Sequence, residues 1–91
     1  MKYIDEIREK TKRSLENEKE ERLALALHEI EECAKKGYYS TAFYYHRTEV
    51  LDFIADYLVK EGFSIHKNYK TFIMTDFPDY FTPFIKIEWK D

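Results

Sequence analysis

The sequence predicts an α+β fold of two layers, in which two helices lie on one face of a three-stranded sheet. The predicted chain order is α-β-α-β-β, and the first helix is long. Two segments carry apolar residues at helical spacing, and each ends at one of the two glycines, Gly37 and Gly62. Three segments rich in aromatic and β-branched residues alternate with the helices or close the chain. At 91 residues the chain fits one domain.

The first predicted helix begins near Lys2 and ends at Gly37. Its second half carries a regular apolar stripe formed by Leu23, Leu27, Ile30 and Ala34. Its first half is charged and sparsely apolar, so residues 1–22 are predicted to be a helical extension and residues 23–91 a single domain.

Two forms of the extension remain open, one continuous helix or a short helix followed by a charged bend. The pairs Glu6–Lys10 and Glu9–Arg13 favour the continuous helix. A projecting helix with a thin apolar stripe can pair with a second copy, or it can be a solvated extension.

The remaining elements follow from pattern and turn residues. Strands are predicted at Tyr38–Tyr45, Phe63–Lys67 and Phe84–Trp89, the last with strict alternation of apolar and polar residues. The second helix is predicted from Thr48 to Glu61, with Thr48 as its N-cap.

The second helix crosses from the first strand to the second, so both helices are expected on one side of the sheet. The expected core joins residues of the last two strands to residues of the two helices: Ile65, Ile85, Ile87 and Trp89 with Leu27, Ile30, Ile54 and Leu58. The other face then has no helix to cover it. Either the segment 68–83 folds over this face as a lid, or the face is a contact surface.

Aromatic residues on the first strand are the main functional signal, because tyrosine is enriched in protein interfaces. The residues predicted to bind a partner lie on or next to the strands: Tyr39, Phe43, Tyr45, Arg47, Lys67 and Tyr69. The expected partner is a protein or a second copy of the chain, most simply in a homodimer. A single-stranded nucleic acid or a nucleotide, stacked on the same rings, is the alternative.

Enzymatic chemistry is not predicted. No phosphate-binding glycine loop, nucleophile motif or paired-carboxylate motif is present. The single cysteine, Cys33, excludes an intramolecular disulfide and a cysteine-based zinc site. No catalytic residue, metal site or cofactor is therefore expected. A small hydrolase using His46 and His66 would require the two imidazoles to approach each other across adjacent strands.

The charge and hydropathy of the chain further limit its possible partners and its expected location. The net charge of -3 counts against a nucleic-acid binder that relies on phosphate contacts. No apolar run is long enough to span a membrane, and the N-terminus does not read as a signal peptide. A reducing cytoplasm is the expected location.

The helix–glycine–strand joint at Gly37, the segment EGFSIHK and the closing FIKIEW resemble small proteins encoded by bacteriophages and prophages. The resemblance extends from Leu23 to Trp89. It implies an accessory role, such as binding and modulating a host or defence protein, in the host cytoplasm. It carries over no functional residue. The charged extension and the segment 68–83 depart from the compact form of these proteins.

Overall fold

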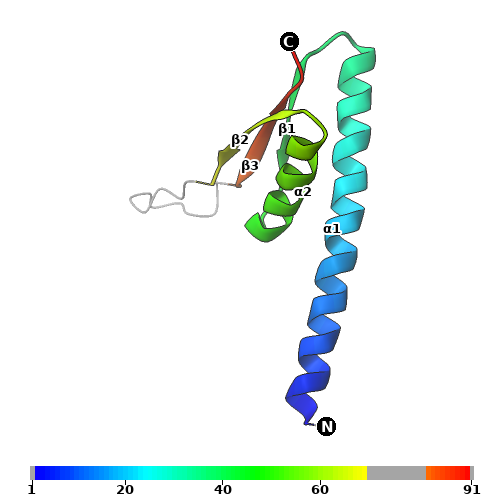
Figure 1. Ribbon diagram of the computed structural model, residues 1–91, viewed down its shortest axis with the longest axis vertical. Helices are drawn as coiled ribbons and strands as arrows, with labels where there is room; N and C mark the ends of the chain where they lie inside the picture. Colours follow the sequence, from blue (N-terminus) through cyan, green and yellow to red (C-terminus); the bar gives the residue numbers. More distant parts are fainter. Residues whose placement is uncertain (1, 70–81, 91) are drawn as a thin grey trace.

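The computed structural model describes residues 2–69 and 82–90, and it confirms the predicted α+β fold (Figure 1). Two helices lie on one side of a three-stranded sheet, and the first helix extends well beyond the sheet. The elements in chain order are α1 (Tyr3–Lys35), β1 (Ser40–Tyr44), α2 (Thr48–Lys60), β2 (Ser64–Asn68) and β3 (Phe84–Glu88). The predicted lid falls mostly on residues 70–81, which lie outside the described residues.

The sheet has the strand order β1-β3-β2, so the last strand lies between the other two. β3 pairs antiparallel with both neighbours, and Ile87 lies opposite Thr41 on one side and Ile65 on the other. Because residues directly opposite one another share a face, this register fixes both faces of the sheet. The face that carries Ile85 and Ile87 meets the helices, and both residues are fully buried.

α1 is one continuous helix of 33 residues, as favoured from its charge pairs. At 1.5 Å per residue it is about 50 Å long, close to the 53 Å length of the whole molecule. Every residue from Lys2 to Ser14 is exposed, and packing against the rest of the chain begins at Leu15. We call residues 2–14 the α1 overhang.

Both helices end in the same hydrogen-bonded turn. The Gly37 amide donates to Ala34 and the Tyr38 amide to Cys33, which together form a Schellman motif. Gly62 and Phe63 repeat this pattern at the end of α2. Both glycines have positive φ, 87° and 98°, a conformation that other residues rarely adopt. The start of α2 differs from the prediction: its N-cap is Arg47, and Thr48 is the first helical residue, with no side-chain cap.

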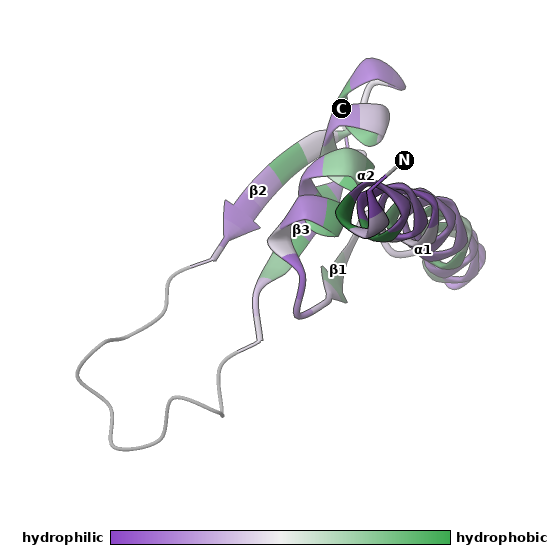
Figure 2. Cartoon of the chain, turned by 90° about the horizontal axis from the view of Figure 1, so that it is seen from below, coloured by the Kyte–Doolittle hydropathy of each residue, from purple (hydrophilic) through white to green (hydrophobic). Residues whose placement is uncertain are grey.

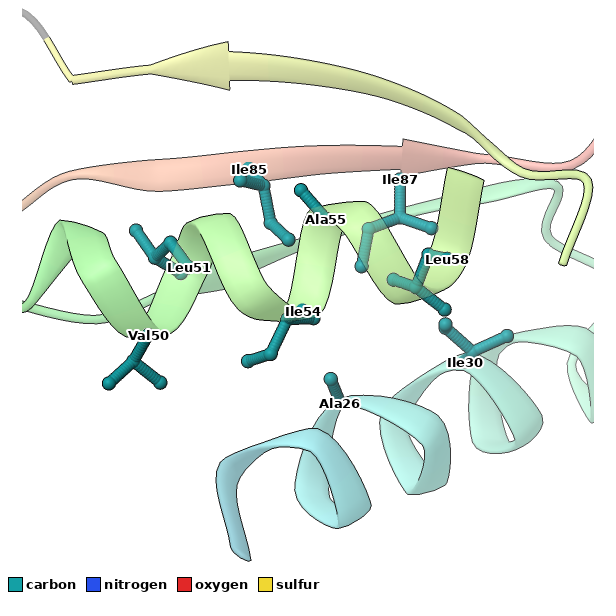
Figure 3. Close-up of a cluster of buried hydrophobic side chains, with 9 residues drawn as sticks. All are labelled: Ala26, Ile30, Val50, Leu51, Ile54, Ala55, Leu58, Ile85 and Ile87. Carbon is teal, nitrogen blue, oxygen red and sulfur yellow. The ribbon is translucent and has the colours of Figure 1, made fainter. Parts of the chain in front are cut away.

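The core lies between the two helices and β3 (Figure 3). Its nine buried residues come from all three elements: Ala26 and Ile30 of α1, Val50, Leu51, Ile54, Ala55 and Leu58 of α2, and Ile85 and Ile87 of β3. Leu27, Ile65 and Trp89 pack against this cluster while remaining partly exposed. The expected core is therefore confirmed, and α2 is its centre.

Replacement of Ile54 by alanine tests this arrangement. Ile54 is fully buried, and its side chain points from α2 towards α1. Ile54→Ala should therefore lower the free energy of unfolding by about 2–5 kcal/mol through lost burial and a residual cavity. Val59 of the same helix is exposed, and Val59→Ala should change it by less than about 0.5 kcal/mol. Urea unfolding measures both, and similar losses in the two variants would contradict the assignment of the core face.

Candidate interaction surfaces

The face of the sheet turned away from the helices carries an aromatic pair beside polar residues. The rings of Tyr44 and Phe84 lie directly across β1 and β3, with centroids 4.8 Å apart. Tyr44 is 59% exposed. Lys86 and His66 lie opposite each other on β3 and β2 and share this face with the two rings.

A shallow hollow of about 340 Å³ lies beside this aromatic pair. It is lined by His66, Lys67, Asn68, Phe84 and Lys86. The ammonium group of Lys86 lies 3.2 Å from the Glu88 carboxylate, so one acidic group offsets the basic lining. The hollow combines one ring, an amide and basic side chains, a set that suits a planar or anionic group.

The residues predicted to bind a partner lie largely on the opposite side of the sheet. Phe43 and Tyr45 belong to the row that faces the helices, and both pack against the core. Tyr69 also packs against the core. Tyr39 is the exception, since its ring is exposed and lies under the Lys90 ammonium group. The predicted set is thus divided among separate places in the fold.

Tyr45 and Arg47 bind a carboxylate on α1. The Tyr45 hydroxyl donates to Glu18, and the Arg47 guanidinium lies 2.5 Å from the same carboxylate. Arg22, one turn further along α1, stacks 4.8 Å from the centre of the Tyr45 ring. The hydrogen bond from Tyr45 lowers the pKa of Glu18, and the same bond raises the pKa of the Tyr45 hydroxyl. This cluster joins α1 to the end of β1.

Lys67 and Tyr69 bind a carboxylate on α2 in the same way. The Lys67 ammonium group lies 2.9 Å from Asp52, and the Tyr69 hydroxyl donates to the same oxygen at 2.9 Å. Lys67 lowers the pKa of Asp52, and partial burial raises the pKa of Tyr69. Four of the six predicted residues are therefore held within the chain in two tyrosine–carboxylate–cation clusters.

The histidine arrangement required by the hydrolase hypothesis is not formed. β3 lies between β1 and β2, so His46, which follows β1, and His66 of β2 are not on adjacent strands. His46 lines a hollow at the start of α2 with Arg47, Thr48 and Glu49, whereas His66 lines the hollow beside Phe84. Within residues 2–69 and 82–90, no group of three metal-binding side chains gathers at one place.

Two features lie outside the six predicted binding residues, although pairing of the projecting helix with a second copy is one of the predicted alternatives. Tyr44 and Phe84 form the aromatic pair on the face turned away from the helices, and the alternation of β3 indicates that Phe84 and the buried Ile85 lie on different faces. The α1 overhang carries three exposed apolar side chains: Tyr3 at 73%, Ile4 at 52% and Ile7 at 40%. The close spacing of these apolar residues in an otherwise charged segment is the sequence signal that could have identified this surface.

The Glu18 cluster should make stability depend on pH. The folded-state pKa of the Glu18 carboxyl lies below the usual value of 4.5. The stability that this carboxylate contributes is therefore present above the unfolded pKa and is lost as pH falls through the folded pKa. Glu18→Gln should therefore destabilise the chain near pH 6, and the difference from wild type should shrink as the pH falls below 4.5. Urea unfolding across this range measures the difference. In a Tyr45→Phe background the Glu18→Gln effect should be smaller; an equal effect would disprove the coupling.

The chain matches no protein-family model, no curated protein and no solved structure. Neither helix in the described part of the chain is both long and apolar enough to cross a bilayer.

Proposed function

We propose that this chain is a non-catalytic protein-binding module that associates with a second copy of itself. The observation that carries the proposal is the α1 overhang. Helices in proteins gain most of their stability from packing an apolar face against other elements. Tyr3, Ile4 and Ile7 lie exposed on a segment that extends beyond the domain. A partner that covers these side chains supplies packing that the described part of the chain does not provide.

The face of the sheet turned away from the helices supports the same proposal. Tyr44 and Phe84 form an aromatic pair beside Lys86. Aromatic residues are enriched in protein interfaces, and polar residues lie at the interface rim. Tyr38 and Tyr39, which precede β1, are also exposed.

For a protein partner other than a second copy of the chain, the support is the resemblance to phage-encoded proteins alone. Residues 23–89 resemble small phage-encoded proteins, so we propose an accessory role in which the module binds and modulates a host or defence protein. The aromatic face is the surface we assign to such a partner.

A nucleic-acid or nucleotide ligand is the second candidate, and one observation favours it. The Phe84 ring borders a hollow that also contains His66, Lys67 and Lys86. Rings next to basic side chains are how single-strand binders stack bases and contact phosphates. The acidic balance of the chain counts against this candidate.

Sedimentation velocity over a concentration series tests the main proposal. We expect the weight-average mass to rise from that of the 11.1 kDa chain towards that of a dimer. The series should extend to about 1 mM, so that a weak dimer is also detected. A monomer at every concentration would disprove self-association.

Titration with a fluorescent single-stranded oligonucleotide at low salt tests the second candidate. Binding should weaken as salt rises, and Phe84→Ser should weaken it several-fold by removing a stacking ring. Phe53→Ser, a ring on α2 beside α1, is the matched control and should leave binding unchanged once folding is verified. No binding at low salt would remove this candidate.

A further inference from the structure

We propose that the second copy binds along α1 in antiparallel orientation, with the two-fold axis passing close to Ser14. This inference rests on the proposed self-association and specifies its surface, orientation and register.

One stripe of α1 is exposed along most of the helix. Its residues follow at intervals of three or four, which places them on one side of a helix with 3.6 residues per turn. On either side of Ser14 they are Tyr3, Ile7, Lys10, Asn17, Glu21 and Leu25. All are exposed, and Leu25 is 46% exposed although it lies beside the domain. The stripe thus has apolar residues towards both ends and polar residues in the middle.

The domain leaves this stripe free. Ala26 and Ile30 point from α1 into the core and lie on nearly the opposite side of the helix from Lys10 and Glu21. Figure 2, a view along α1, shows α2 and the sheet on one side of the helix. Packing against the domain begins at Leu15, so a two-fold axis at Ser14 places the two domains towards opposite ends of the helix pair.

The two halves of the helix carry opposite charge. Residues 2–13 contain five basic and three acidic side chains, whereas residues 15–26 contain two basic and four acidic side chains. In an antiparallel pair centred on Ser14, the basic half of each copy lies beside the acidic half of the other. Helices pack at 8–10 Å between axes, a separation at which charges still interact at physiological ionic strength.

Individual side chains agree with this register. Tyr3 lies at the level of Leu25 of the second copy, so an exposed ring meets an exposed aliphatic side chain. Lys10 lies at the level of Glu18 of the second copy and within one turn of its Glu21. A parallel pair would instead place Lys10 beside Lys10 and Glu21 beside Glu21, and like charges at such positions destabilise helix pairs. The charges therefore favour the antiparallel pair.

Charge reversal at Lys10 and Glu21 tests the inference on the full chain. Lys10→Glu and Glu21→Lys should each weaken the homodimer roughly tenfold, because each reversal converts two attractive pairs into two repulsive ones. The double variant Lys10→Glu/Glu21→Lys should restore the wild-type dissociation constant. Lys12→Glu makes the same change in net charge two residues away, on the opposite side of the helix, and should leave dimerisation unchanged. Sedimentation velocity at low salt measures all four, and circular dichroism verifies that each remains helical.

The outcomes separate this inference from the proposed function. If the wild type dimerises and every variant dimerises equally well, self-association uses another surface. That result would overturn the antiparallel α1 pair but not the proposed self-association. A double variant weaker than both single variants would overturn the register. A monomeric wild type would overturn both proposals.

Discussion

The packing of Ile85 and Ile87 against α2 determines the direction in which every side chain of the sheet points. β3 is the central strand, and both of its neighbours are in register with it. Once Ile87 is buried, Thr41 and Ile65 must face the helices, and Tyr44 and Phe84 must face away. A slip of one residue between β1 and β3 would exchange the two aromatic rows of β1. The identity of the exposed surface thus depends on this one buried contact.

The polar clusters at Glu18 and Asp52 attach the edges of the sheet to the helices. Glu18 joins α1 to the end of β1 through Tyr45 and Arg47, and Asp52 joins α2 to β2 through Lys67. Both carboxylates are held in their charged form by the groups around them. The Glu18 cluster lies near the first residue of α1 that packs on the domain, so it fixes the position from which the overhang projects.

Much of the fold could be predicted because single segments carry unambiguous patterns. The alternation of FIKIEW separates Ile85 and Ile87 from Phe84 and Lys86, and the glycines mark both helix ends. The first strand has no such contrast, since both rows of YYSTAFYY are aromatic. Only the pairing of Phe43 with Ile85 decides which row is buried. Because of this pairing, the predicted binding residues Phe43 and Tyr45 lie on the helix side of the sheet. Tyr44, which was not among the predicted residues, lies on the other face.

The central position of β3 also has a consequence for how the chain reaches its native state. β1 and β2 flank β3 and do not pair with each other. During synthesis, therefore, neither edge strand meets its partner until the residues of β3 have left the ribosome. α1 and α2 are complete earlier and can associate through Ala26, Ile30, Ile54 and Leu58 beforehand. The packed helices can thus act as a template for the sheet, which forms in one late step when β3 inserts between β1 and β2.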